Sequence, residues 1–261
     1  MATSNAGDSD LAFILHTYPY RETSLILEVF SRRCGRLGII ARGARRPRSA
    51  LRGTLRPFQP LALAWFGKAE LKTLKTAEAE RIYPQLAGPS LLSAFYLNEL
   101  ILKLSHREDP HEGLFDAYDA ALLALQVITR DAVNHAGDAV ARREPMKQIA
   151  ATLRRFEKQL LREMGYGLLL EQEAESGAPI VAAQHYRYVL EKGPVAASPG
   201  AIATYDAVQL SGKTLLDLAR DDYDDPVTAQ QSKQLMRFVI NHFLNGAELH
   251  TRQIIKELQQ N

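Results

Sequence analysis

The period of the hydrophobic pattern changes near residue 85, and this change constrains the fold more than any other feature of the chain. Before that point, apolar residues alternate with polar ones in short runs that end at Gly, Pro or charged turns, a pattern typical of β-strands. After it, apolar residues recur at intervals of three and four, as in amphipathic helices. With 261 residues, 46% of them hydrophobic, the chain is long enough for two domains of different class.

The first part of the chain is predicted to form a closed β-barrel. Alternating runs occupy residues 11–18, 23–31, 37–41, 58–66 and 70–77, and residues 43–53 form a loop rich in Gly, Pro and Arg. Five short antiparallel strands leave unpaired edges unless the sheet closes on itself, and the five-stranded OB-fold barrel is a common closed sheet of this size. We therefore predict an OB-fold domain over residues 11–84. Residues 1–10 are small and polar, and we expect a disordered tail there rather than a signal peptide.

The second part, residues 85–261, is predicted to be an all-α domain, which makes the whole chain an α+β multidomain protein. The Gly- and Pro-rich stretch 168–200 interrupts the helical pattern, and we interpret it as an irregular insertion with a small β-hairpin that includes residues 186–190. Residues 135–143 are expected to be a loop or a short helix, and Thr214 is a candidate helix N-cap. Helices are predicted at residues 90–105, 112–128, 146–164, 201–209, 214–219 and 228–244, and from residue 249 onward.

Positive charge is concentrated in residues 29–69. This segment carries ten basic residues and no acidic one, whereas the whole chain has 32 Lys and Arg against 30 Asp and Glu. The rest of the chain therefore has 22 basic and 30 acidic residues, a balance of −8. The nearly neutral total hides a strong separation of charge, which is the electrostatic signature of a surface that binds polyanions.

Most of these basic residues are arginine, whose planar guanidinium binds phosphate oxygens in pairs and stacks on bases. We therefore predict a nucleic-acid interface with little sequence preference, because contacts to phosphates carry no sequence code. A solvated basic loop without a partner is the alternative that the sequence leaves open. The predicted DNA-binding residues are Arg32, Arg33, Arg36, Arg42, Arg45, Arg46, Arg48, Arg52, Arg56, Lys68, Lys72 and Tyr20.

Tyr20 is included because its aromatic ring lies in a predicted turn, where it can stack on a base. Three further aromatic residues, Phe58, Trp65 and Phe66, lie in the basic segment. For Phe58 and Trp65 we favour a place in the barrel core, since aromatic residues of strands usually fill the interior.

Other classes of function fit the sequence less well. The one cysteine, Cys34, rules out an intramolecular disulfide and a cysteine-based zinc site and suits a reducing cytosol. Residues 211–214 (SGKT) resemble the end of a phosphate-binding P-loop, but Ala207 occupies the position of its first glycine. A nuclease needs carboxylates that hold a metal beside the basic surface, and residues 29–69 have none.

A second potential metal cluster is also interpreted as structural. His106, Asp109, His111 and Glu112 lie around Pro110 in a spacing that matches no site we can name, so we expect a solvated loop. No apolar run is long enough to span a membrane, and we expect a soluble protein. We predict a protein without catalytic residues, metal or cofactor.

Several short motifs, in a fixed order, resemble one known family. They are residues 20–24 (YRETS), 42–46 (RGARR), 51–53 (LRG), 55–58 (LRPF), 70–74 (ELKTL), 97–100 (LNEL), 153–157 (LRRFE), 186–188 (YRY) and 249–253 (LHTRQ). Each motif is weak alone, but the ordered set is specific and extends along nearly the whole chain. The chain therefore resembles the RecO family of bacterial recombination mediators.

The resemblance implies a non-enzymatic protein of the bacterial cytoplasm, associated with the nucleoid, that binds single- and double-stranded DNA and anneals complementary strands. It also implies partnership with RecR, and with the acidic C-terminal tail of single-stranded-DNA-binding protein, so that RecA is loaded onto DNA. By the same resemblance, Arg154, with its neighbour Arg155, is the candidate to pair with the carboxylates of that tail. An RNA-binding OB-fold protein is the alternative, because the same physics applies to RNA.

The sequence departs from the family in one region. Several members carry a four-cysteine zinc module in the part that matches residues 168–200, whereas this chain has Glu171, Gln172 and Glu173 there and no cysteine. We expect the hairpin to persist without the metal.

Overall fold

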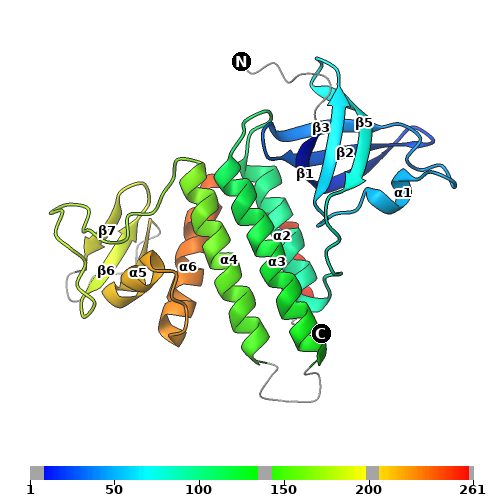
Figure 1. The fold of residues 1–261 in the computed structure, drawn as a ribbon. Coiled ribbons are helices and arrows are strands. Elements are labelled where there is room, and N and C mark those ends of the chain that lie inside the picture. Colours follow the sequence, from blue (N-terminus) through cyan, green and yellow to red (C-terminus); the bar gives the residue numbers. More distant parts are fainter. Residues whose placement is uncertain (1–8, 135–142, 198–205, 259–261) are drawn as a thin grey trace. The chain divides into compact units, whose positions relative to one another are not determined.

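The computed structural model describes residues 9–134, 143–197 and 206–258 (Figure 1). Its contacts divide the chain into two compact units, Met1–Val127 together with Thr251–Asn261, and Ile128–His250. Helices α2 (Gly88–Leu104) and α7 (His250–Leu258) and most of α3 (Glu112–Asn134) are therefore grouped with the N-terminal strands. Among the described residues, no helix combines the length and the apolar character needed to cross a membrane.

The N-terminal strands close into the predicted five-stranded OB-like barrel. Their order around the barrel is β1-β2-β3-β5-β4, with β4 pairing back onto β1. Only β3 and β5 run parallel, the arrangement of the OB fold. The strands are β1 (Asp10–Tyr20), β2 (Ser24–Ser31), β3 (Gly35–Ala41), β4 (Leu61–Phe66) and β5 (Leu71–Ala79).

The first strand begins one residue earlier than predicted. Asp10, expected to be part of a disordered tail, is buried in β1 and pairs with Arg33 at 2.9 Å, while the Ser31 hydroxyl donates to its carboxylate. A carboxylate that is bonded in this way cannot belong to a solvated tail. The remainder of the predicted tail, up to residue 8, lies outside the described residues.

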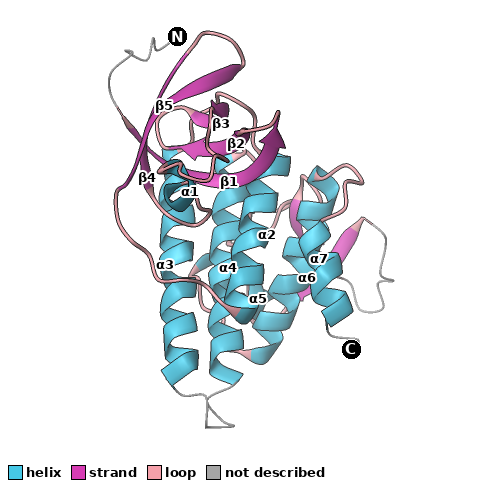
Figure 2. Ribbon diagram, turned by 90° about the vertical axis from the view of Figure 1, so that its right-hand side faces the viewer, coloured by secondary structure: helices cyan, strands magenta, loops and turns pink. Residues whose placement is uncertain are grey.

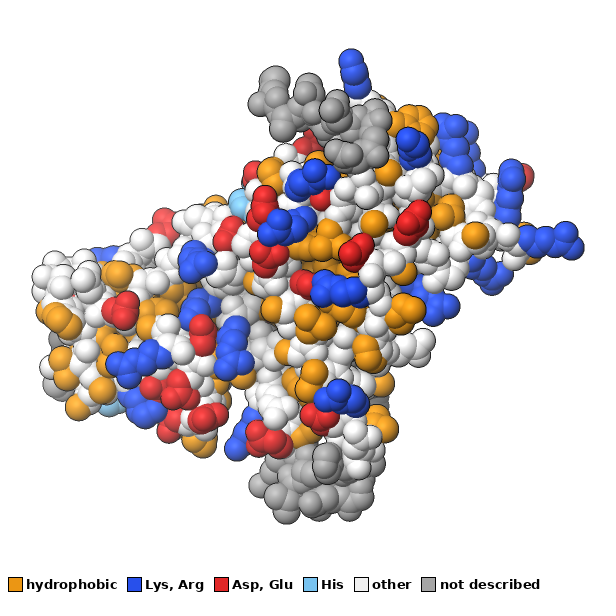
Figure 3. Space-filling view, viewed as in Figure 1, with side chains coloured by type: hydrophobic (Ala, Val, Ile, Leu, Met, Phe, Trp, Pro, Cys, Tyr) orange, Lys and Arg blue, Asp and Glu red, His pale blue; other side chains and the backbone are white. Residues whose placement is uncertain are grey.

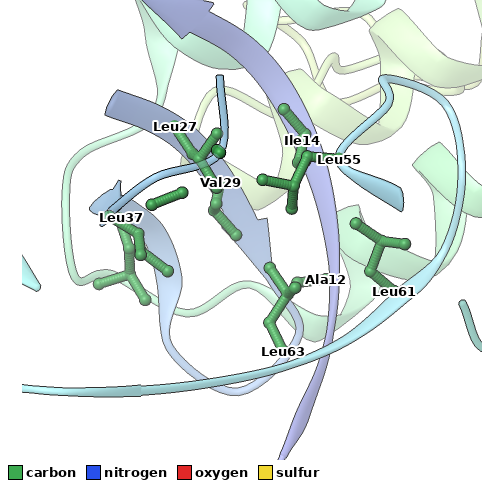
Figure 4. Packing of buried hydrophobic residues seen from close by; sticks show 11 residues of the cluster. Ala12, Ile14, Leu27, Val29, Leu37, Leu55, Leu61 and Leu63 are labelled. Carbon is green, nitrogen blue, oxygen red and sulfur yellow. The ribbon is translucent and has the colours of Figure 1, made fainter. Parts of the chain in front are cut away.

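Aliphatic side chains from β1 to β4 fill the barrel interior (Figure 4), and Leu74 and Ala77 of β5 pack against them. The connection between β3 and β4 contributes to this core, because Leu55 and Ala44 are buried in it and Leu51 packs against it. The predicted loop therefore contains the short helix α1 (Leu51–Thr54), which Figure 2 shows beside the barrel strands. Apolar side chains thus attach a highly charged segment firmly to the barrel.

The two aromatic residues expected to fill the barrel have different positions. Trp65 packs against the barrel core, as predicted. Phe58 is buried outside it, 4.9 Å from the ring of Phe95 in α2. Its backbone is left-handed, with φ of 63°, and this conformation cannot continue a strand. The fourth strand consequently begins at Leu61 rather than at Phe58.

Helices α2 and α3 cover part of the outer surface of the barrel. Phe13 of β1 and Phe30 of β2 pack against Phe115 of α3 at centroid distances of 5.3 and 5.4 Å. Asn98 of α2 donates to the carbonyl of Leu15 at 2.7 Å. Both faces of these strands are therefore buried along part of their length, which explains why apolar residues occupy outward positions there.

The second unit combines helices with a small sheet. Helices α4 (Arg143–Glu163), α5 (Gly212–Ala219) and α6 (Pro226–Phe243) accompany strands in the order β7-β6-β8. The predicted hairpin is present as β6 (His185–Val189) and β7 (Gly193–Ala196), and β8 (Ala207–Ser211) adds a third strand.

Two predictions for this region were wrong. A helix was predicted over residues 201–209, but residues 207–209 belong to β8, while residues up to 205 lie outside the described part. Pairing of β8 with the exposed edge of β6 outweighs its local helical pattern. The N-cap of α5 is Ser211 rather than Thr214, because the Ser211 hydroxyl accepts from the main-chain N–H of Thr214 at 3.1 Å.

Within residues 168–200, the turn that follows Glu173 is organised by the carboxylate of this residue. The side chain of Glu173 accepts hydrogen bonds from the main-chain N–H of Ser176 at 2.6 Å and from its hydroxyl at 2.5 Å. The main-chain N–H of Glu173 donates to the carbonyl of Ala178 at 2.8 Å. These donors lower the pKa of Glu173, the Ser176 hydroxyl being the largest cause.

Candidate nucleic-acid interface

Seven of the predicted DNA-binding side chains are exposed and carry no compensating charge. None of them forms an ion pair with any residue that the structure describes. In Figure 3, Lys and Arg side chains project from the barrel near α1, with few acidic side chains among them. We call these seven residues the basic face: Arg42, Arg45, Arg46, Arg48, Arg52, Arg56 and Lys68.

Apolar anchors and main-chain hydrogen bonds hold the first part of the basic face in place. Ala44 is 1% exposed, and the main-chain N–H of Arg46 donates to the carbonyl of Gly43 at 3.1 Å. The main-chain N–H of Arg45 donates to the carbonyl of Thr23 at 2.9 Å, which joins this loop to the β1–β2 turn. The Arg45 guanidinium also donates to the carbonyl of Arg21 at 3.3 Å.

The second part of the basic face depends on α1. Leu51 and Leu55 pack against the barrel core, and each is followed directly by an exposed arginine, Arg52 and Arg56. A spacing of four residues places the two leucines on one side of a helical turn. The arginines that follow them are consequently exposed to solvent on a rigid support.

Carboxylates already neutralise the other predicted basic residues. Arg32 pairs with Glu112 at 2.7 Å and with Asp116 at 3.1 Å, and its hydrogen bonds to Asp116 are the main reason that its pKa is raised. Arg33 pairs with Asp10 at 2.9 Å. These two residues act chiefly in contacts within the protein, and their charge contributes less to a polyanion site.

Arg36 and Lys72 are similarly engaged. The Arg36 guanidinium donates to the carbonyl of Ser105 at 3.0 Å and lies 3.7 Å from the Glu28 carboxylate. Its burial lowers its pKa, although Glu28 opposes this effect. Lys72 pairs with Glu108 at 2.7 Å. The basic residues of one sequence segment therefore fall into two groups in the structure: some form ion pairs with carboxylates, and the others stay exposed without such a pair among the described residues.

The segment between α2 and α3 covers part of the β2–β3 surface, which OB folds commonly use for oligonucleotides. The Arg107 side chain pairs with Glu28 and approaches the sheet so closely that a Cβ at Gly38 would lie 2.7 Å from its terminal nitrogen. The main-chain N–H of Glu108 donates to the Arg36 carbonyl at 3.0 Å. This segment therefore covers the part of the β2–β3 surface around Glu28 and Gly38.

Tyr20 was expected in a turn, but it is the last residue of β1 and pairs with Ser24 at the start of β2. Its ring is partly exposed, with the guanidinium carbon of Arg21 at 5.2 Å from the centroid. Arg21 and Lys75 are exposed cations that the sequence prediction missed, and neither has an ion pair among the described residues. The sequence indicated them only weakly, because both lie outside residues 29–69, the segment without acidic residues, and have Glu22 and Glu78 near them.

Arg154 and Arg155 of α4, predicted to bind an acidic peptide tail, differ in exposure. The Arg154 side chain is 9% exposed and pairs with Glu157 at 2.6 Å, and its Nε makes no hydrogen bond to a described residue. Arg155 is exposed, donates to the carbonyl of Asp221 at 3.1 Å, and lies 5.6 Å from the ring centroid of Tyr223.

Further basic residues lie near this pair. The pKa of Lys233 is lowered by burial, and then by the nearby charges of Arg237 and Arg154. Lys158 donates to the carbonyl of Leu218 at 2.8 Å and pairs with Asp221 at 2.7 Å. We call Arg154, Arg155, Lys158, Lys233 and Arg237 the α4–α6 basic cluster; positive charges outnumber the acids that contact them, Glu157 and Asp221.

The alternative sites considered in the sequence have structural explanations. In the P-loop-like motif, the Ser211 and Thr214 hydroxyls both donate to Gln231, and Lys213 pairs with Asp217 at 2.5 Å. In the described part of the chain, no three His, Cys, Asp or Glu residues are grouped so as to hold a metal ion. Burial raises the pKa of the Cys34 thiol, which makes it a poor nucleophile.

Sequence comparisons relate the chain to known proteins. The family model "Recombination protein O N terminal" matches residues 8–83, and "Recombination protein O C terminal" matches residues 87–136. A "DNA repair protein RecO" from Nitrosospira multiformis is 48% identical over 249 residues, which cover 95% of each chain. Proteins of the same name from Aromatoleum aromaticum and Dechloromonas aromatica are 45% and 48% identical, with 97% of each chain covered.

Proposed function

Because the chain belongs to the RecO family of bacterial DNA repair proteins, we propose that it is a recombination mediator that acts without catalysis. In this role it binds single- and double-stranded DNA with little sequence preference and anneals complementary strands. With RecR, it helps to load RecA onto DNA that is coated by single-stranded-DNA-binding protein. It acts in the bacterial cytoplasm, at the nucleoid.

The observation that carries the proposal is the basic face, with its seven exposed cations that no described carboxylate neutralises. Such cations bind phosphates and release the counterions condensed on them, which is the main source of affinity that is independent of sequence. The apolar anchors Ala44, Leu51 and Leu55 hold the arginines in place before DNA binds, so that less conformational entropy is lost on binding.

Annealing follows from the same charges. Two complementary strands repel each other through their phosphates, and a cationic surface reduces this repulsion while raising the local concentration of both strands. No covalent bond has to change during annealing, so the proposed role requires no catalytic residue.

The α4–α6 basic cluster is the proposed site for the acidic tail of single-stranded-DNA-binding protein. Arg155 is exposed, and Arg154 has an Nε donor that no described residue uses. Tail carboxylates would find cations there that outnumber the acids contacting them, and Tyr223 lies beside Arg155. Electrostatic complementarity of this kind favours specific recognition of an acidic peptide.

The test of the DNA-binding proposal is the triple substitution Arg42→Ala, Arg45→Ala and Arg46→Ala. Losing three phosphate contacts should reduce the slope of log affinity against log salt by about 2 for single strands and lower affinity about 100-fold at 0.1 M salt. The rate of annealing at low salt should fall in parallel. Binding is measured by fluorescence anisotropy and annealing by energy transfer between labelled strands.

The matched control removes the same net charge elsewhere, by Arg130→Ala, Lys147→Ala and Arg220→Ala, three exposed residues of the second unit. This control should bind and anneal DNA as the unmodified protein does. Equal losses in both triple variants would mean that net charge alone matters, and an unchanged triple variant of the basic face would refute the proposed site.

A further inference from the structure

A row of residues that face outward crosses all five strands of the barrel. The strand register pairs Tyr18 of β1 with Ile26 of β2, and Ile26 with Ile40 of β3. It continues by pairing Ile40 with Thr73 of β5, and Thr73 with Phe66 of β4. We call these five residues the cross-barrel row.

The row faces solvent because its sequence neighbours face the barrel core. Leu27 and Ile39, which follow Ile26 and precede Ile40, belong to the buried barrel core, and side chains of a strand alternate between its faces. The rings at the two ends of the row, Tyr18 and Phe66, are 47% and 51% exposed.

A β-bulge gives Tyr18 its outward direction. Ile14 pairs with Val29, but His16 pairs with Glu28, so the register shifts between them and one extra residue lies in β1. Such a shift by one residue exchanges the inward and outward faces of a strand. Without the bulge, Ile14, His16 and Tyr18 would lie on the same face of β1. With it, Ile14 points into the barrel, whereas His16 and Tyr18 point out.

Positive charge flanks the cross-barrel row. Arg42 and Lys75 follow Ile40 and Thr73 by two residues, and both are exposed. Arg21 lies just beyond the end of β1, and Lys68 follows Phe66 by two residues. None of these four cations has an ion pair among the described residues.

The neighbouring row of outward positions, which contains Glu28 and Gly38, is covered by the Arg107 side chain. There, Glu28 pairs with Arg107 and Arg36, and the Arg107 guanidinium occupies the space above Gly38. The cross-barrel row is therefore the last open row of the β1–β3 surface before the region that is covered by the segment between α2 and α3.

We propose that the cross-barrel row binds the bases of single-stranded DNA, with Tyr18 and Phe66 stacking on bases and the flanking cations contacting phosphates. This inference rests on the proposed function and deepens it, because it assigns a site that selects single strands. Strands about 4.8 Å apart give the row a length of about 19 Å, which accommodates a short run of unpaired bases. A duplex hides its base faces and gains only the phosphate contacts.

The test is the double substitution Tyr18→Ala and Phe66→Ala. It should lower affinity for a mixed-sequence single strand by at least about tenfold, since removing one aromatic–base stack typically costs that much. Affinity for the corresponding duplex should change by less than about twofold, because phosphate contacts remain. Tyr18→Phe with Phe66→Tyr keeps both rings and should restore single-strand binding.

Two comparisons isolate stacking from other effects. On a single strand with abasic sugars, the double variant and the unmodified protein should bind equally. The control Tyr166→Ala removes a ring of matching exposure, 48%, from the second unit and should change nothing. If the double variant melts early, Tyr18→Leu with Phe66→Leu replaces it, because leucine keeps apolar surface but cannot stack.

The outcomes separate this inference from the proposed function. Base binding by the row is overturned if the double variant binds single strands with unchanged affinity, or if it loses as much affinity for duplex or abasic DNA as for single strands. DNA binding by the basic face still stands in that case if the triple variant of the basic face loses affinity. Failure of the unmodified protein to bind DNA at low salt overturns both.

Discussion

Arginine side chains that lie close together in sequence have different roles in this protein. Arg32, Arg33 and Arg36 are neutralised by carboxylates, whereas Arg42 and Arg45 remain exposed without an ion pair among the described residues. The first group joins parts of the first unit, because Arg32 and its partner Asp116 are 84 positions apart. The second group remains available for phosphates, so only exposure and pairing separate a structural arginine from one that can bind a ligand.

Arg154 is predicted to have a structural role as well as a place in the tail site. Arg154→Ala leaves the carboxylate of Glu157, 0% exposed, without its 2.6 Å partner, and should cost about 3–5 kcal/mol of stability. Arg155→Ala removes a surface group and should cost at most about 1 kcal/mol. Urea unfolding gives both values, and binding of a labelled acidic peptide with a C-terminal Phe gives the functional effect.

The double variant Arg154→Met with Glu157→Leu separates these two roles. Removing both charges together should recover most of the stability, since no buried charge is left without its partner. Peptide binding should remain weak in this variant and in Arg155→Ala. Normal peptide affinity in all three variants would place the tail site elsewhere, and an unchanged unfolding midpoint for Arg154→Ala would contradict the structural role.

At the scale of elements, strand pairing stabilises the small sheet, and local hydrogen bonds stabilise the turn around Glu173. Strand β8 forms on the edge of β6 although its sequence has a helical pattern. The main-chain N–H and the hydroxyl of Ser176 donate to the Glu173 carboxylate and hold the turn around it. The sequence had predicted a helix over residues 201–209 and irregular structure over residues 168–200, so neither feature was expected from local pattern alone.

The turn around Glu173 should make stability depend on pH. Its donors lower the pKa of the folded carboxyl below its ordinary value of 4.5, so the ionised form stabilises the fold. This stabilisation is complete above that ordinary value and is lost as the pH falls through the lower folded value. Urea unfolding at pH 7 and in the acid range below 4.5 should show the loss, and Glu173→Gln should remove it.

Glu171→Gln is the matched control, because Glu171 is exposed in the same segment. Its unfolding should follow that of the unmodified protein at both pH values. If Glu173→Gln unfolds with the same dependence on pH as the unmodified protein, another carboxylate is responsible.

On the scale of the whole molecule, we expect the separation of charge to determine which surface of the protein binds DNA. The formal net charge is only +2, yet all seven cations of the basic face are on the connections between barrel strands. Overall charge therefore contributes little to attraction, and the local field of the barrel contributes most of it.

A steep dependence on salt should follow. If all seven cations contact phosphates, log affinity for single strands should fall with log salt at a slope of about −5. Titrations with potassium chloride measure this slope, and single-stranded RNA of equal length is the comparison that addresses RNA binding. A slope near zero would mean that phosphates are not the main contacts, and much tighter binding of RNA would favour the RNA-binding alternative.

The sequence alone determined the classes of element, the five-stranded barrel and the basic segment. These properties depend on hydrophobic period and local composition, which a single stretch of chain carries by itself. It therefore predicted the strands from Leu11 onward and the basic connection after β3, but it placed a helix where β8 pairs with β6.

Only the tertiary structure decided which basic residues remain exposed without an ion pair among the described residues, and which outward residues lie in one row across the barrel. Partners such as Asp116 for Arg32 and Glu108 for Lys72 come from distant parts of the chain, so no local pattern indicates them. The register that aligns Tyr18 with Phe66 across five strands arises only when the barrel closes. The physical reason is that burial, ion pairing and register depend on contacts between residues far apart in sequence, whereas periodicity and composition do not.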